Sequence, residues 1–334
     1  MFDVITIGTV IRDVFIKSPL FRVVSDKRHI ETIGFEAGEA QCFALGSKIQ
    51  IERPVFAGGG GAHNAAVTFA RQGLRTGIVG SLGDDLAGKE IVRTLKAEKV
   101  TPMMHVDKKA GTGYGAVLLA PGGERTILVY RGASTKLASR DIPEKKMRAR
   151  WAYVVPGEIP FSVIQPLVHR MKKNGTKIAM NPSLPYLSLK KHETEVLYSL
   201  LDVLIMNRDE ASLLLGIAHY EERKAFREFN RMIPGIAVVT NGKNGAMASD
   251  GSYLYKAGTF SEKVIADRTG AGDAFGSGFI AGLIKGNDFG YALRFAAANA
   301  TSVVESVGAT TGVLTTREFS RPRWKSFDLD VDRL

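Results

Sequence analysis

The chain has 334 residues, of which 45% are hydrophobic and 24% are charged, so it can bury a large core and has the composition of an ordinary globular protein. A single cysteine, Cys42, excludes an internal disulfide and a cysteine metal cluster. The net charge is +11, but the basic residues form short groups with acids between them and no interleaved aromatics, which favours a small polyanionic ligand over nucleic acid.

The N-terminal segment FDVITIG (2–8) is a short apolar run ending in glycine, as expected of a buried strand in a parallel sheet. It lacks the charged start and long apolar core of a signal peptide. No run approaches the roughly 20 apolar residues that span a bilayer. We therefore expect a soluble, cytoplasmic protein with no membrane partner.

The first half of the chain mixes strand and helix patterns. Region 15–54 shows no sustained helical period. Beyond it, the pattern predicts a helix from near Ala62, a strand at 76–82, a helix at 85–98, and two hairpin strands at 113–120 and 124–131.

From Trp151 onward, short apolar runs alternate with helical segments of roughly ten to fifteen residues, a pattern typical of βαβ units. Two short strands follow around residue 250, and helices follow at 271–286 and 288–305. The sequence therefore predicts an α/β protein with a three-layer α/β/α domain and a mostly parallel central sheet. We assign residues 1–14, 55–106 and 135–334 to this domain, and 15–54 and 107–134 to a small β-rich insertion.

The stretch TGAGDAFGSGF (269–279) combines glycines with one aspartate at the start of a helical pattern. Gly270 and Gly272 leave the backbone free to turn tightly, and a helix N-terminus binds anions through its unpaired N–H groups. Asp273 lies in the first turn, where it is either a catalytic carboxylate or a plain partner of the helix dipole. By itself the stretch does not decide between these two interpretations.

A second glycine cluster, AGGGGAHNAA (57–66), also precedes a helix. Four consecutive glycines suggest a ligand in close approach or an unusual turn. Asn64 could bind a hydroxyl group or satisfy nearby backbone. We interpret His63 as a helix-surface residue or a local hydrogen-bond partner, because no second ligand accompanies it at metal-binding spacing.

Two further sites follow predicted strands. Asn207 and Glu210 have the spacing of a capping box, and they also share one helical face from which they could hold a hydrated Mg²⁺ ion. Thr240 and Gly242 lie at a strand end, a normal place for ligand loops in an open α/β sheet. The segment GDDLAGKE (83–90) is not a P-loop, because Glu90 replaces the magnesium-binding hydroxyl.

Six motifs in chain order resemble the ribokinase-like family of sugar and nucleoside kinases, often called the PfkB family. The resemblance covers nearly the whole chain. The motifs are GGGAHNAA (59–66) followed by GIVGSLGDDLAG (77–88), NP (181–182), NRDE (207–210), TNGKNGA (240–246), DRTGAGD (267–273) and AAANAT (296–301).

The resemblance implies an ATP-dependent kinase that phosphorylates a primary hydroxyl of a sugar, with Mg²⁺ and K⁺ as cofactors. Asp273 would be the general base, and the backbone of Gly270, Ala271 and Gly272 would form the anion hole. Because Asp273 lies beside a positive helix end, we expect no raised pKa for it. The β-rich insertion would be a lid over the substrate and the contact of a homodimer.

The resemblance also assigns binding residues. The substrate-side residues would be Asp13, Gly59, Gly60, Asn64 and Glu158. The ATP and Mg²⁺ residues would be Asn207 and Glu210, with Thr240, Gly242, Gly245 and Asn299 around the nucleotide. The monovalent cation would lie between the loop that contains Asp267 and Thr269 and the loop from Ser302 to Gly312, which contains Gly308.

Three departures weaken a strict ribose assignment or raise new questions. Arg268 replaces the small residue usual after the first aspartate of the last signature, so it could alter the cation loop or contact a phosphate. Ile11 and Gly61 replace a sugar-binding asparagine and a lysine. Phe35 and Phe43 in the insertion either stack on a nucleobase, which favours a nucleoside kinase, or form lid core. A non-catalytic sugar or nucleotide sensor is a further alternative.

Overall fold

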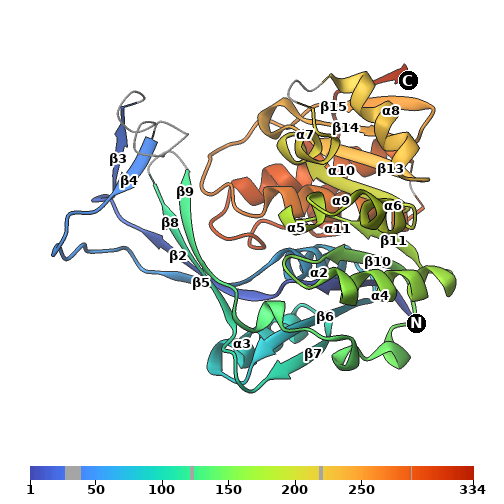
Figure 1. The fold of residues 1–334 in the computed structure, drawn as a ribbon. Helices are drawn as coiled ribbons and strands as arrows, with labels where there is room; N and C mark the ends of the chain where they lie inside the picture. The colour runs from blue at the N-terminus through green and yellow to red at the C-terminus, as the bar shows by residue number, and fades with distance from the viewer. Residues whose placement is uncertain (27–38, 121–123, 218–220, 287) are drawn as a thin grey trace.

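A ten-stranded sheet runs through the centre of the computed structural model, which describes residues 1–26, 39–120, 124–217, 221–286 and 288–334. The strands from β7 to β13 are parallel, and antiparallel strands extend one edge (Figure 1). In spatial order the strands are β7 (Thr101–Asp107), β6 (Thr76–Gly83), β1 (Phe2–Gly8), β10 (Ala149–Val155), β11 (Lys177–Met180), β12 (Val203–Asn207), β13 (Ile236–Thr240), β14 (Ala246–Ser249), β15 (Tyr253–Ala257) and β16 (Leu329–Arg333).

Helices cover both faces of this sheet, because successive side chains of each strand point to opposite faces. The layer on one face contains α2 (Gly61–Arg71), α3 (Leu86–Ala97), α9 (Ala271–Ile284), α10 (Phe289–Val304) and the short α11 (Thr316–Phe319). The layer on the other face contains α4 (Phe161–Lys173), α5 (Leu184–Leu187), α6 (Lys191–Tyr198), α7 (Arg208–Leu215) and α8 (Glu222–Met232). Strands covered on both faces read as continuous apolar runs, which is why the pattern of β1 is recognisable in the sequence.

A separate four-stranded sheet, called the small sheet below, projects from the main body (Figure 1). Its strands are, in spatial order, β5 (Val55–Gly59), β2 (Ile11–Lys17), β8 (Gly113–Leu119) and β9 (Arg125–Tyr130). The short strands β3 (Arg22–Ser25) and β4 (Glu39–Cys42) pair only with each other.

The predicted three-layer α/β/α fold with a small additional sheet is confirmed. The bounds of the insertion differ from the predicted 15–54 and 107–134, because β2 begins at Ile11 and β5 adds Val55–Gly59 to the small sheet. β2 alternates in burial only over part of its length and β5 does not alternate, so no clear boundary could be predicted there. In the part of the chain that the structure describes, no helix combines the length and apolar character needed to cross a membrane.

Candidate active site

Helix α9 begins after a glycine that the turn requires. Gly270 has a φ of 83°, and a Cβ atom there would lie 2.7 Å from Cα of Ala309. Gly272, by contrast, has open space at its Cβ position. The first backbone N–H groups of α9 have no partners within the helix, and such groups attract anions. The residues predicted to form an anion hole thus lie at a helix N-terminus.

Asp273 lies in the first turn of α9, and its carboxylate contacts the second glycine-rich segment. Nδ2 of Asn64 donates a hydrogen bond of 2.8 Å to Oδ2 of Asp273. Burial raises the pKa of Asp273, and the hydrogen bond from Asn64 opposes that rise. Our expectation that this pKa would not be raised was wrong, because removal of the carboxylate from water outweighs the hydrogen bond from Asn64.

His63 supports this contact from the preceding position of α2. Its side chain is buried, and burial lowers its pKa to about 4, so the imidazole is neutral at pH 7. Nδ1 lies 3.4 Å from Oδ1 of Asn64, and the ring occupies the space beside Gly58. Of the two interpretations made from the sequence, the local hydrogen-bond partner agrees with the structure and the helix-surface position does not.

Asp13 comes from strand β2 of the small sheet and is buried. A Cβ atom on Gly59 would lie 1.9 Å from Oδ2 of Asp13, and one on Gly115 would lie 2.3 Å from Oδ1. The two glycines therefore leave the space that the carboxylate occupies. Burial raises the pKa of Asp13 to about 7, and the negative charges of Asp273 and Asp267 add to this rise.

The rest of the four-glycine run is also explained by close contacts. Gly60 has a φ of 89°, and a Cβ atom there would lie 2.5 Å from the carbonyl oxygen of Thr9. A Cβ atom on Gly61 would lie 2.4 Å from Cγ1 of Val155 and 3.1 Å from Oδ1 of Asp273, so the site has no room for a side chain such as lysine at this position.

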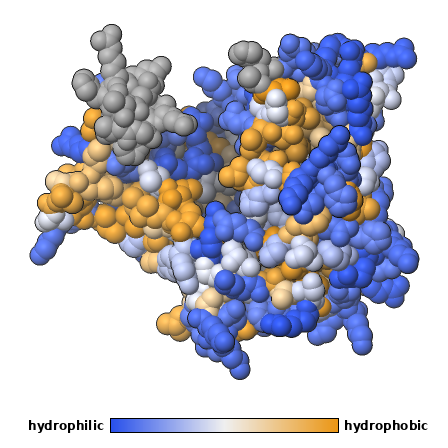
Figure 2. Space-filling view, viewed as in Figure 1, coloured by the Kyte–Doolittle hydropathy of each residue, from blue (hydrophilic) through white to orange (hydrophobic). Residues whose placement is uncertain are grey.

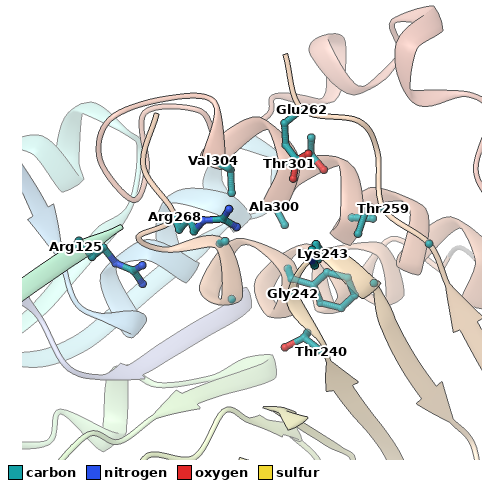
Figure 3. A pocket seen from close by; sticks show the side chains of 16 residues that line it. Arg125, Thr240, Gly242, Lys243, Thr259, Glu262, Arg268, Ala300, Thr301 and Val304 are labelled. Atoms are coloured by element: carbon teal, nitrogen blue, oxygen red, sulfur yellow. The ribbon is translucent and has the colours of Figure 1, made fainter. Parts of the chain in front are cut away.

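Two neighbouring cavities meet at the N-terminus of α9. The base cavity, of about 250 Å³, is lined by Arg125, Asn181, Ile205, Met206, Asn207, Glu210, Thr240, Arg268, Gly270, Gly272 and Asp273. The second cavity, of about 300 Å³, lies between α9, α10 and the end of β13 (Figure 3). Its walls include five residues predicted around the nucleotide or in the anion hole: Thr240, Gly242, Gly245, Ala271 and Gly272.

Asn207 and Glu210 form the predicted capping box at the start of α7. Oδ1 of Asn207 accepts from the backbone N–H of Glu210, and Oε2 of Glu210 accepts from the backbone N–H of Asn207, each at 2.8 Å. Burial is the main cause that raises the pKa of Glu210. Both residues also line the base cavity, so the capping role and a role toward a ligand are compatible here.

Two of the predicted site residues lie outside the walls of both cavities. Asn299 is fully buried and lines neither cavity; its amide donates to the carbonyl of Ala274 at 2.9 Å and accepts from the N–H of Leu314 at 2.9 Å. It therefore ties α10 to α9, and its predicted role around the nucleotide stays a prediction. Glu158 is exposed and forms an ion pair of 3.1 Å with Arg131, at the end of β9.

The three residues predicted for a monovalent cation lie together. Oδ1 of Asp267, which is fully buried, accepts from the N–H of Thr269 at 2.8 Å, and its Oδ2 accepts from the N–H of Gly308 at 3.1 Å. Oγ1 of Thr269 is buried and has no hydrogen-bond partner among the described residues. An oxygen ligand of this kind suits a hard cation such as potassium, so the residues fit the ion.

Sequence reasoning missed Arg125 as a site residue. It begins strand β9 of the small sheet but lines both cavities of the large domain, as does Arg268. Arg268 was visible in the sequence as a departure from the signature, whereas nothing in the local sequence distinguishes Arg125.

Phe43 packs edge-to-face on Phe21 with ring centroids 5.3 Å apart, and Phe35 lies outside the described residues.

Comparison with known proteins agrees with this geometry. The model of the pfkB family of carbohydrate kinases matches residues 27–317. The chain therefore belongs to the pfkB family and is a kinase. Kinases of this family use ATP, typically with Mg²⁺. Family membership and the kinase names of the relatives argue against the alternative of a non-catalytic sensor.

Among curated proteins, ribokinase of Bacillus subtilis is 31% identical over 304 residues, covering 89% of this chain and 93% of that protein. 5-Dehydro-2-deoxygluconokinase of Geobacillus thermodenitrificans is 28% identical over 268 residues, covering 74% and 78%. Among solved structures, Arabidopsis thaliana ribokinase complexed with ribose and ATP has a TM-score of 0.76 at 22% identity, covering 97% and 99%. Adenosine kinase from Sinorhizobium meliloti has a TM-score of 0.75 at 22% identity, covering 92% and 95%.

Proposed function

We propose that this kinase transfers the γ-phosphoryl group of ATP to a primary hydroxyl of a sugar, with Asp273 as the general base. The observation that carries the proposal is the position of Asp273, at the start of α9 in a cavity that adjoins the predicted nucleotide wall. ATP would occupy the second cavity, and the acceptor would lie between Asp273 and Asp13.

The reaction needs little covalent chemistry from the protein. The acceptor hydroxyl attacks the γ-phosphorus, the bond from that phosphorus to the bridging oxygen breaks, and ADP leaves with the electron pair. The hydroxyl proton passes to the carboxylate of Asp273. The N–H groups at the start of α9 would stabilise the charge on the transferring group. The raised pKa of Asp273 makes it a better proton acceptor once it is ionised.

Glu210 and Asn207 would hold Mg²⁺, in part through water, from the wall of the base cavity. When bound, Mg²⁺ would neutralise charge on the phosphates. Asp267, Thr269 and Gly308 would hold K⁺ behind the anion hole, a proposal supported by the unpartnered hydroxyl of Thr269. Activity that is equal with and without potassium would contradict the cation assignment.

A nucleoside is the second candidate for the acceptor. Ile11 lies against Gly113, and Gly61 has no side chain, so neither position offers the polar group used for a sugar. Phe43 is 44% exposed on the projecting part of the small-sheet region and could move toward a nucleobase only by leaving Phe21. The contact of Phe43 with Phe21 favours a sugar as acceptor, whereas Ile11 and Gly61 favour an acceptor with an apolar part.

The proposal is tested by measuring ADP release with ribose, fructose, adenosine, cytidine, inosine and keto-deoxy sugars, each with and without potassium. The variant Asp273→Asn, assayed with every acceptor, gives the background ADP release. We expect one sugar to release ADP in the wild type and not in Asp273→Asn. Faster release with a nucleoside than with every sugar would replace the sugar proposal by its alternative, and no acceptor-dependent release would contradict both.

We further propose that the small sheet closes over the acceptor and forms a homodimer contact. Its outer strands expose apolar side chains, which gather over this sheet in Figure 2. Three of these side chains, Phe56, Leu128 and Tyr130, share one face of the small sheet and are 52–59% exposed. Val55, Ile127 and Val129 lie on the opposite face, together with the buried Phe15 and Val117. Burial of such a patch between two copies would be favourable. Light scattering should give the mass of a dimer for the wild type and of a monomer for Leu128→Lys; a monomeric wild type would contradict the contact.

A further inference from the structure

Two arginines stand where the cavities meet. Only four residues line both the base cavity and the second cavity within the described part of the chain: Arg125, Thr240, Arg268 and Gly272. In Figure 3, Arg125 and Arg268 lie on the side of the second cavity away from Thr259 and Lys243. The group that passes from a nucleotide in one cavity to an acceptor in the other must cross this junction.

The backbone of Arg268 is well anchored, whereas its side chain is weakly held. The neighbours Asp267 and Thr269 are fixed by the buried carboxylate of Asp267. Nε of Arg268 is buried without a hydrogen-bond partner among the described residues. Its charge partner is Glu124, with Nε and Oε1 3.5 Å apart, and the side chain of Glu124 is 69% exposed. A pair with this exposure contributes little and can be exchanged for another anion.

The surrounding charges explain why a second cation is needed. Glu210 and Asp273 line the base cavity, and Glu262 and Lys243 line the second cavity. Apart from the two arginines, three carboxylates and one ammonium group line the two cavities, so a phosphate that enters them needs further positive charge close by. A guanidinium group carries a permanent charge and can donate two parallel hydrogen bonds to phosphate oxygens. Arg125 supplies its charge from the small sheet, and Arg268 supplies its charge from the loop before α9.

We propose that Arg268 and Arg125 bind the γ-phosphoryl group of ATP during transfer, and that Glu124 holds Arg268 until the nucleotide replaces it. This proposal rests on the proposed function, since it needs ATP in the second cavity. The arginines neither donate nor accept a proton; they stabilise charge on the phosphoryl oxygens. Because Glu124 and Arg125 are adjacent in sequence, movement of the small sheet changes both contacts together.

The test compares nucleotides that differ by the γ-phosphate. Calorimetry gives the Kd of MgADP and of the magnesium complex of the non-hydrolysable ATP analogue AMPPNP for wild type, Arg268→Thr and Arg268→Lys. We expect Arg268→Thr to weaken AMPPNP binding about tenfold, to leave ADP binding within about twofold, and to lower kcat about 10²-fold. Arg268→Lys should give intermediate values, since it keeps the charge and loses the planar fork. Arg125→Thr should weaken AMPPNP binding in the same selective way.

The outcomes separate this inference from the function on which it rests. Arg140→Thr is the matched control, because the side chain of Arg140 is 89% exposed and lines neither cavity. Equal effects of Arg268→Thr on both nucleotides, or a kcat within about threefold of wild type, would overturn the inference alone. A wild type that binds neither nucleotide would overturn the proposed function and the inference with it. Glu124→Gln should tighten AMPPNP binding about twofold to threefold. Unchanged or weaker binding would contradict the proposal that Glu124 holds Arg268 until the nucleotide phosphate replaces it.

Discussion

The large domain and the small sheet each bring one carboxylate to the site, and the two differ in how they are held. Asp273 accepts a hydrogen bond from Asn64 at a helix N-terminus. Asp13 sits between two glycines of neighbouring strands, and no donor from the described residues reaches its carboxylate. A carboxylate with free lone pairs is suited to bind a hydroxyl, and one that is oriented by an amide is suited to take a proton. We therefore propose a binding role for Asp13 and a chemical role for Asp273.

The largest effect should come from Asp273→Asn. Loss of the base should lower kcat by about 10²–10⁴-fold while ATP affinity and folding persist, since the amide keeps the shape of the side chain. Steady-state kinetics with the acceptor found in the screen measures this change. Asp288→Asn is the matched control, because Asp288 caps α10 and asparagine caps helices equally well. A near wild-type kcat in Asp273→Asn would show that Asp273 is not the general base.

Asp13→Asn should act mainly on acceptor binding. Loss of a charged hydrogen-bond acceptor should raise the KM for the acceptor by about 10–100-fold, with a smaller change in kcat. If instead kcat falls as far as in Asp273→Asn and KM stays constant, the division of roles between the two carboxylates is wrong.

The same variant has a pH signature in stability. The folded-state pKa of Asp13 is about 7 and its unfolded value is near 3.8, so wild type loses stability as pH rises between these values. The asparagine of Asp13→Asn does not titrate. The free energy of unfolding of this variant, relative to that of the wild type, should therefore rise by roughly 2 kcal/mol from pH 5 to pH 8. Urea unfolding at the two pH values measures it, and a constant difference would contradict the raised pKa.

Asn64→Leu should shift the pH dependence of activity. Its amide lowers the pKa of Asp273, so its removal should raise that pKa further. The base works when ionised, and the acidic limb of kcat/KM should therefore move to higher pH. Asn174→Leu, at the exposed end of α4, is the control. An unmoved limb would show that the Asn64 contact does not tune the base.

The smallest effect should come from Glu210→Gln. Glutamine can keep the capping box, so stability should change by less than about 1 kcal/mol, whereas the magnesium concentration for half-maximal rate should rise. Glu318→Gln is the matched control, because Thr315 and Glu318 form the same capping box in α11. An unaltered magnesium titration would leave Glu210 with the capping role alone.

Local patterns predicted the order of strands and helices and the two helix starts near the site, because apolar periodicity and glycine act over a few residues. The strand–helix alternation after Trp151 and the turn at Gly270 are examples. The bounds of the small sheet were not predictable in this way, because β2 and β5 are half-covered strands whose partners lie far away in sequence.

The fold class, the family motifs and the groups able to do chemistry could be predicted from the sequence, since they depend on residue types and short spacings. Which of these groups meet depends on how the chain packs in three dimensions. Asn64 contacts Asp273 across 209 residues of chain, and Arg125, from another sheet, lines the same cavity as Gly270 and Gly272. The tertiary structure also accounts for the raised pKa values of Asp13 and Asp273 and for the hydrogen bond from Asn299 to Ala274, because burial is a property of the packed chain and not of a motif.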